Sequence, residues 1–169
     1  MTTMGVSIAV PEPFGGELRD KRAAFGDPAA ATVPSHVTLL PPFEVADDEV
    51  EALAESLTVV ASAHEPFVMS LRSTGTFRPD SPVVFIPVSE GISNIEMLAA
   101  AVRQKIGDEA AQFPFHPHVT VAHHLDDASL DHAFADLAHY EATFSVHAFV
   151  LYKHEDSTGW VPSMEFSLG

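Results

Sequence analysis

The chain has 169 residues, of which 46% are hydrophobic, and this length and composition suit one compact domain with a sizeable core. Its 24 acidic and 8 basic residues give a net charge of −16, which opposes tight binding to a long nucleic acid, because such binding depends on Lys and Arg displacing counterions from phosphates. Cysteine is absent, which excludes disulfides and thiolate chemistry, and no stretch has enough consecutive apolar residues to span a membrane.

Strands and helices are expected to alternate along the chain. A strand is indicated by apolar residues at every second position, and a helix by apolar residues three or four apart with Gly or Pro at its boundaries. In chain order, we expect a strand at 5–11, a helix at 17–25, a strand at 35–40 that is broken by Pro41 and Pro42, and a helix at 47–64. We then expect strands at 66–77 and 82–88, a helix at 93–107, a strand within 115–125, a helix at 126–140, and closing strands at 142–154 and 159–169. This order predicts an α+β fold in two similar halves.

One short motif occurs twice. The segment PSHVTLLPPF at 34–43 is nearly repeated by FHPHVTVAHHL at 115–125, and an acidic-headed helix is expected after each copy. His118 follows His36 by 82 residues, close to half of the 169-residue chain, which indicates an internal duplication. Because neither half carries enough strand to bury its own face well, we expect a bilobal single domain. Two pseudo-symmetric antiparallel-sheet lobes with outer helices should surround a central cleft.

The motif pairs a histidine with a threonine two positions later. Side chains alternate along a strand, so His36 and Thr38 should share one face, and His118 and Thr120 should share the equivalent face of the second strand. Cleavage of a phosphodiester needs a base for the attacking oxygen and an acid for the leaving oxygen, and two histidines supply both near neutral pH. The two hydroxyls can donate hydrogen bonds to the non-bridging phosphate oxygens. The repeat therefore predicts metal-free phosphodiester chemistry.

The paired sequences HVTL and HVTV, with PSHVTLLPPF around the first, resemble the 2H phosphoesterase superfamily, also called the 2′,5′ RNA ligase or cyclic phosphodiesterase family. The resemblance covers nearly the whole chain. It implies a bilobal α+β fold and hydrolysis or formation of 2′,3′-cyclic, 2′,5′-linked or related phosphodiesters. It further implies that His118 is the base and His36 the acid.

The chain departs from this family at one position. Many members carry Arg or Lys two residues after the last apolar residue of the second motif, where this chain has His123. An imidazole attracts phosphate less strongly at pH 7. We therefore count His123 as a substrate-binding candidate, and Arg78, Lys153 and His154 as candidates to supply the missing charge.

Three aromatic residues lie near turns or strand ends, where a side chain can stack on a nucleobase. They are Phe77, Tyr152 and Trp160, and packing in the core is the alternative role for each of them.

Two other classes of function fit the same residues. His116 and His118 share a strand face and can form a metal-ligand pair, which would make the chain a metal-dependent hydrolase. The second alternative is a non-catalytic module that binds phosphorylated ligands. The favoured interpretation is a cytoplasmic, monomeric enzyme without a cofactor, acting on a small phosphodiester or an RNA end, with no membrane or long nucleic acid as partner.

Overall fold

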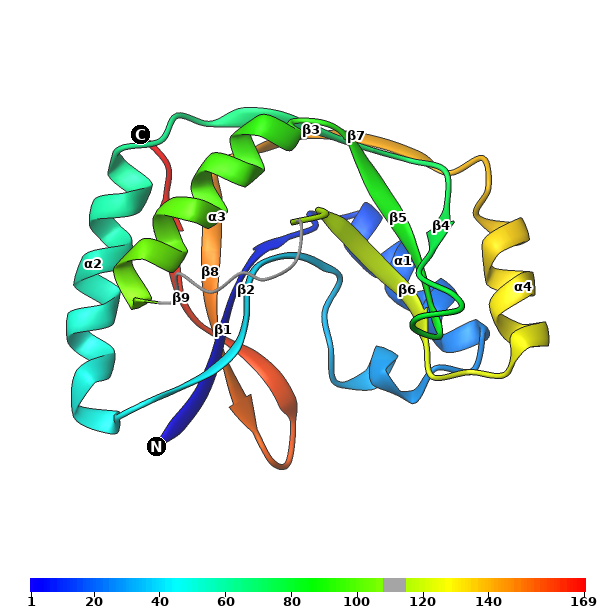
Figure 1. The fold of residues 1–169 in the computed structure, drawn as a ribbon, viewed down its shortest axis with the longest axis horizontal. Helices are drawn as coiled ribbons and strands as arrows, with labels where there is room; N and C mark the ends of the chain where they lie inside the picture. Colours follow the sequence, from blue (N-terminus) through cyan, green and yellow to red (C-terminus); the bar gives the residue numbers. More distant parts are fainter. Residues whose placement is uncertain (108–114) are drawn as a thin grey trace.

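Two antiparallel sheets form the two lobes of this computed structural model, which describes residues 1–107 and 115–169 (Figure 1). The first sheet has the order β2-β1-β8-β9, from strands β1 (Thr2–Ala9), β2 (His36–Val45), β8 (Ala148–Glu155) and β9 (Gly159–Ser167). The second sheet contains β3 (Phe67–Arg72), β4 (Gly75–Thr76), β5 (Val83–Glu90), β6 (His118–His123) and β7 (Glu141–Val146). The expected bilobal α+β fold is confirmed.

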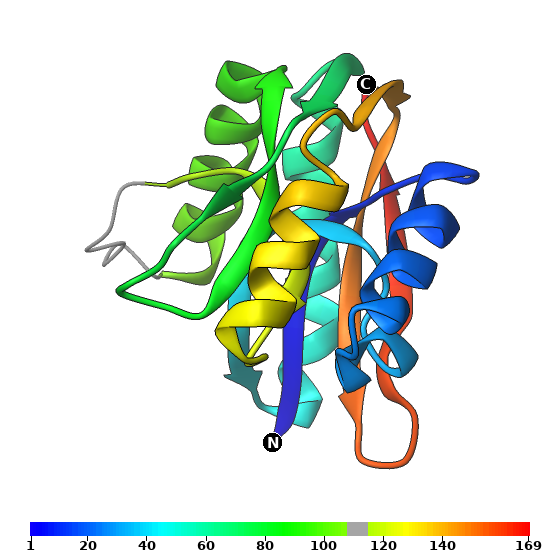
Figure 2. The same ribbon diagram turned by 90° about the vertical axis from the view of Figure 1, so that its right-hand side faces the viewer.

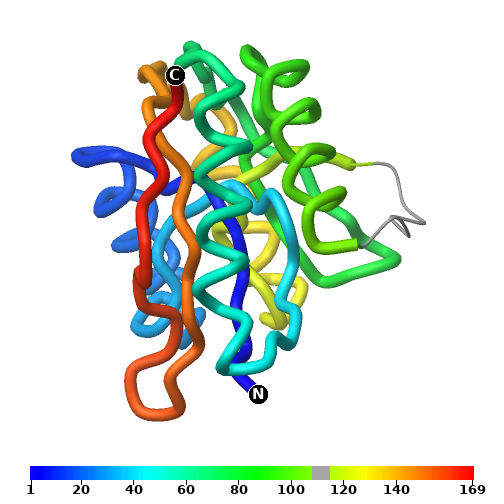
Figure 3. The backbone as a smooth tube through the Cα atoms, turned by 90° about the vertical axis from the view of Figure 1, so that its left-hand side faces the viewer, coloured from blue at the N-terminus to red at the C-terminus, as the bar shows by residue number. Residues whose placement is uncertain are grey.

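The helices cover the outer faces of the two sheets. They are α1 (Phe14–Ala24), α2 (Val50–Ser62), α3 (Ile92–Ile106) and α4 (Asp127–Asp136), with short 3-10 helices at Pro28–Ala31 and Asp47–Glu49. Helix α2 packs against β9 and α3 against β2, so both lie on the first sheet (Figure 3). Helices α1 and α4 both contact β6 of the second sheet, and Figure 2 shows α4, in yellow, in front of that sheet. In the described part of the chain, no helix combines the length and apolar character needed to cross a membrane.

Helices α1 and α3 each pack on the opposite lobe. Helix α1 connects β1 to β2 of the first sheet but contacts β6 of the second. Helix α3 connects β5 to β6 of the second sheet but contacts β2 of the first. This exchange is the same in both halves, and it ties each motif strand to a helix from the other lobe.

The prediction that Pro41 and Pro42 end the first motif strand is wrong. Strand β2 continues through both prolines to Val45. It lies at the edge of its sheet, where a missing N–H breaks no bond to a further strand, and both prolines are exposed. The register with β1 also shifts there, between the pairs Met4 with Phe43 and Val6 with Leu40.

The single strand expected at 142–154 is also wrong, because two strands occupy this segment and meet at His147. Strand β7 pairs with β3 in the second sheet, whereas β8 pairs with β1 and β9 in the first. The chain thus crosses between lobes at this point. As a result, the first lobe takes strands from both ends of the chain, and the lobes do not correspond to the two sequence halves.

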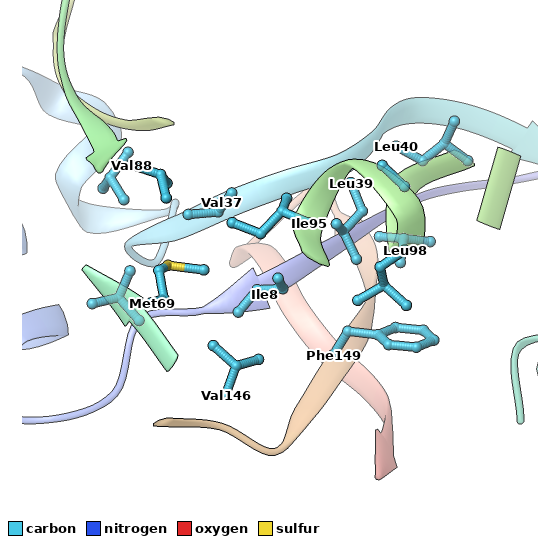
Figure 4. Close-up of a cluster of buried hydrophobic side chains, with 14 of the residues drawn as sticks. Ile8, Val37, Leu39, Leu40, Met69, Val88, Ile95, Leu98, Val146 and Phe149 are labelled. Atoms are coloured by element: carbon cyan, nitrogen blue, oxygen red, sulfur yellow. The ribbon is translucent and has the colours of Figure 1, made fainter. Parts of the chain in front are cut away.

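A single hydrophobic core connects the lobes (Figure 4). Ile8 and Val37 from the first sheet, Ile95 from α3 and Met69 from the second sheet all belong to it. Each of these side chains is at most 2% exposed. The core therefore fixes the relative position of the two motif strands.

Candidate active site

The two motif strands are held in the same way by their inner neighbours. His36 lies opposite Ala9 and Thr38 opposite Ser7 of β1, just as His118 lies opposite Pro87 and Thr120 opposite Phe85 of β5. In both pairs the register shifts by one residue immediately after the threonine. A β-bulge bends a strand and redirects its side chains. The duplication therefore extends from the motif sequence to an irregularity of the backbone.

Alternation along both strands follows the prediction. Val37 and Val119, next to the motif histidines, are 0% exposed. The histidines and threonines of the motifs are half-buried. Each strand is thus anchored by its apolar face and presents an imidazole and a hydroxyl from the opposite face.

Both motif histidines are oriented by a carbonyl two residues earlier in the chain. Nδ1 of His36 lies 2.6 Å from the Pro34 oxygen, and Nδ1 of His118 lies 2.6 Å from the His116 oxygen. Because a carbonyl oxygen only accepts, Nδ1 carries a proton and donates it in this contact. This arrangement leaves Nε2 of each ring to accept or deliver a proton.

The two imidazoles interact electrostatically. Burial is the largest cause that lowers the pKa of His36 and of His118 below its ordinary value, because burial disfavours the charged ring. For His118, the charges of His116 and His36 lower the pKa further. Strand β2 also contacts β6. The two motif strands therefore lie close together although their histidines are 82 residues apart in the chain, and the charge of His36 reaches His118.

An aromatic cluster surrounds His118. The rings of Phe77 and Phe85 lie 5.2 and 5.0 Å from that of His118 between centroids, and Phe77 and Phe85 pack on each other at 4.3 Å. Gly75 makes room for the cluster, since a Cβ there would lie 2.7 Å from the Phe85 ring. Phe77, which the sequence placed only near a strand end, thus packs directly against His118.

A pocket lies beside His36 on the first sheet. Its lining includes His36, Thr38, Tyr152 and Trp160. Gly5 also lines it, and the Trp160 ring lies over this glycine, 3.6 Å from where a Cβ would stand. Tyr152 and Trp160, two of the three aromatic candidates, therefore lie next to the first motif.

Two of the three cationic candidates are engaged by acidic groups. Arg78 Nη1 lies 2.9 Å from Asp131 Oδ1 of α4, and Lys153 Nζ lies 3.2 Å from Glu155 Oε1. His154 is exposed and packs edge-on against Trp160, with 5.1 Å between ring centroids.

His123 ends strand β6 and stacks on His124, with 3.6 Å between ring centroids. Burial is the main cause that lowers its pKa, and the charge of His124 is the next. Its backbone N–H donates to Asp27 Oδ2 at 3.0 Å. His123 is therefore a weak source of positive charge at neutral pH.

Sequence reasoning assigned no role to Arg22 of α1. In the structure Arg22 Nε donates to Asp27 Oδ2 at 2.7 Å, and both residues are buried. The charge of Arg22 lowers the pKa of both His36 and His123. Arg22 is one of two arginines in the short helix predicted at 17–25, and no signal in the sequence distinguishes it from Arg19, because the groups around it come from separate segments of the chain.

The metal-site interpretation depends on a third ligand beside His116 and His118. Within residues 1–107 and 115–169, no three His, Cys, Asp or Glu side chains are placed to hold a metal ion together. His116 also points its backbone oxygen at the His118 ring, where it orients the imidazole.

Imidazole titration followed by NMR should place the pKa of His36 and of His118 below the ordinary value of 6.5. In the unfolded chain both rings return to about 6.5, so the folded protein binds fewer protons. Their contribution to stability is therefore present above pH 6.5 and is lost as the pH falls through the folded pKa values. A pKa above 6.5 for either motif histidine would contradict the buried geometry.

Comparison with known proteins gives matches over most of the chain. Residues 10–158 match the model of the 2′-5′ RNA ligase superfamily. A Bacillus cytotoxicus protein named for an inferred phosphoesterase activity is 29% identical over 147 residues, covering 85% of this chain and 84% of that protein. Escherichia coli LigT in its apo form has the same fold, with a TM-score of 0.68, 22% identity and coverage of 99% of this chain and 97% of LigT. LigT complexed with 3′-AMP aligns with a TM-score of 0.69 and 21% identity, over 99% of this chain and 98% of LigT.

Proposed function

Because the chain belongs to the 2′-5′ RNA ligase superfamily of 2H phosphoesterases, we propose that it is a metal-independent phosphodiesterase acting on 2′,3′-cyclic or 2′,5′-linked nucleotides. The observation that carries the proposal is the duplicated histidine geometry. Each motif histidine has Nδ1 held by a carbonyl at 2.6 Å, which leaves Nε2 to exchange a proton with a substrate.

Two such imidazoles can divide acid and base catalysis between them. A neutral Nε2 takes the proton from the attacking water or hydroxyl, and a protonated Nε2 delivers a proton to the leaving ribose oxygen. The hydroxyls of Thr38 and Thr120, on the same strand faces, can donate to the non-bridging oxygens and stabilise the charge that grows on them. Every proton in this scheme is carried by a residue of the chain.

The pocket beside His36 suits the nucleoside part of the substrate. Trp160 lies over Gly5 and is half-buried, so that its ring can stack on a base. LigT, which shares the fold, has been crystallised with 3′-AMP, a ligand that combines a phosphate with a nucleoside. We propose the same combination for this chain, with the phosphate between the motif histidines and the base toward Trp160.

The test is an assay of 2′,3′-cyclic nucleotides, 2′,5′-linked dinucleotides and ADP-ribose cyclic phosphate in excess chelator. Turnover of at least one substrate in chelator is the expected result. Loss of turnover in chelator, with recovery on addition of zinc, would favour the metal-dependent alternative at His116 and His118. Binding of nucleotides without turnover would favour the non-catalytic module.

Replacing Trp160 with alanine should raise KM for a cyclic nucleotide roughly ten-fold, because base stacking contributes about 1–3 kcal/mol, while kcat changes little. Steady-state kinetics on wild type and variant measure both constants. Phe134→Ala is the matched control, since Phe134 is an aromatic residue of α4 and is 38% exposed. An unchanged KM in Trp160→Ala would remove Trp160 from the substrate site.

A further inference from the structure

A site for a phosphodiester needs positive charge, and this chain has only 8 Lys and Arg residues, all within the described segments. Five of them are bonded to groups other than the motifs. Arg19 donates to the carbonyls of Ala30 and Ala31, Lys21 pairs with Asp136, Arg72 with Glu141, Arg78 with Asp131, and Lys153 with Glu155. Arg103 and Lys105 are on α3, where Arg103 lies over the ring of Phe115.

Arg22 differs from these residues because it is buried and has unused donors. Its side chain is 9% exposed, and it donates through Nε to Asp27 Oδ2 at 2.7 Å. Within the described segments, this is the one hydrogen bond of its guanidinium group, so both Nη nitrogens lack an acceptor. The side-chain atoms that are sealed from solvent without a partner are Arg103 Nε and Tyr140 Oη. Among the residues that the structure describes, the Nη nitrogens of Arg22 therefore have no acceptor and are not completely sealed from solvent.

Asp27 holds Arg22 against the second motif strand. Its Oδ1 accepts from the Ala29 N–H at 2.9 Å, and its Oδ2 accepts from the His123 N–H at 3.0 Å as well as from Arg22. Strand β6, which ends at His123, is thereby connected to the guanidinium through one carboxylate. The carboxylate of Asp27 therefore holds the guanidinium group of Arg22 next to the backbone of His123, the residue at whose position the superfamily resemblance led us to expect a cation.

Helix α1 is also bonded to the first motif strand. Ser35, the residue before His36, donates through Oγ to the carbonyl of Gly15 in α1 at 2.8 Å. The charge of Arg22 acts on His36 as well as on His123, since it lowers the pKa of both. Arg22 thus reaches electrostatically to both motif segments from a single helix.

We propose that Arg22 is the phosphate anchor of this site, donating from its free Nη nitrogens to a non-bridging oxygen of the substrate, with Asp27 as the residue that positions it. This inference rests on the proposed function and assigns the charge that His123 does not supply. A guanidinium group suits the role because it is always charged and presents two parallel N–H donors that match a phosphate edge. Asp27 occupies Nε alone, so both Nη nitrogens remain to donate to a ligand.

The experiment measures binding of inorganic phosphate by calorimetry to the intact chain, with no turnover required. Arg22→Gln should weaken phosphate binding about ten-fold or more, as expected when a charge-assisted hydrogen bond is lost. Arg22→Lys, which keeps the charge but loses the fork, should give an intermediate affinity. Arg72→Gln is the charge-matched control, because Arg72 is 71% exposed and pairs with Glu141.

Removing Arg22 alone leaves Asp27 buried without its partner, so Arg22→Gln/Asp27→Asn is the variant that separates anchoring from structure. We expect this double variant to bind phosphate as weakly as Arg22→Gln. Recovery of wild-type phosphate affinity in the double variant would overturn the proposal, as would the absence of any phosphate binding by the wild type at millimolar concentration. Titration of His36 by NMR gives a second readout, since its pKa should rise in Arg22→Gln when the neighbouring positive charge is gone.

The two proposals can fail separately. If the wild type binds phosphate in an Arg22-dependent way but hydrolyses none of the phosphodiesters, the anchor is correct and the proposed function is not. If the wild type hydrolyses a substrate while Arg22→Gln binds phosphate normally, the function is correct and the anchor is wrong.

Discussion

His118→Ala and His36→Ala should each lower kcat/KM for a 2′,3′-cyclic nucleotide by about 10³-fold, within the range of 10²–10⁴ typical of a lost general acid or base. In each ring a carbonyl at 2.6 Å holds Nδ1, so that Nε2 is the nitrogen that remains to transfer a proton. Neither threonine can replace this function, since a hydroxyl near neutral pH is a poor base. Steady-state kinetics on the purified variants measure the loss.

The control is His139→Ala, which removes an exposed histidine that lies outside the site. Its kcat/KM should equal that of the wild type. Thermal unfolding should show that both motif variants remain folded, because the motif histidines are half-buried while the valines beside them carry the packing. A folded His118→Ala or His36→Ala variant with more than about a tenth of wild-type activity would exclude acid/base catalysis by that residue.

A good leaving group should rescue His36→Ala but not His118→Ala. The family resemblance makes His36 the acid, and a p-nitrophenolate leaving group departs without needing a proton. The ratio of kcat/KM between His36→Ala and wild type should therefore be about 10²-fold higher on a p-nitrophenyl phosphodiester than on the cyclic nucleotide. His118→Ala should stay inactive on both substrates, because the attacking water still needs a base.

Rescue of His118→Ala instead would reverse the two roles. One feature of the structure favours this reversed assignment. An acid must be protonated, and the positive charge of Arg22 disfavours the protonated form of His36. If neither variant is rescued, both histidines bind phosphate and neither transfers the critical proton. The same two substrates, assayed on both variants, separate all three outcomes.

The local patterns of the sequence were sufficient to predict much of the fold. Apolar residues at every second position placed His36 and Thr38 on one face of a strand, and the structure has this alternation. Gly107 was expected to end a helix, and it does so with a φ of 80°, which favours glycine. These features depend on residues close together in the chain, so that the sequence alone determines them.

The prediction failed where pairing with a distant strand decides the conformation. Pro41 and Pro42 remain in a strand because β2 lies at an edge, a fact that depends on the order of strands in the sheet. The break at His147 arises because β7 pairs with β3 and β8 pairs with β1, which places neighbouring segments in different sheets. Neither strand partner lies within 60 residues of its pair in the sequence.

The candidate site shows the same division. The sequence identified the two motif histidines because they occur in a repeated pattern, and the carbonyls that hold their Nδ1 atoms lie within that pattern. Other neighbours, such as Phe77 beside His118 and Trp160 in the pocket of His36, come from segments outside it. Only the tertiary structure engages Arg78 with Asp131, and only it places Trp160 over Gly5. Arg22 is the clearest case: its importance depends on Asp27, which also accepts from the backbone of His123, 96 residues further along the chain. Such contacts form through chain folding and not through local propensity, which is why they could be found only in three dimensions.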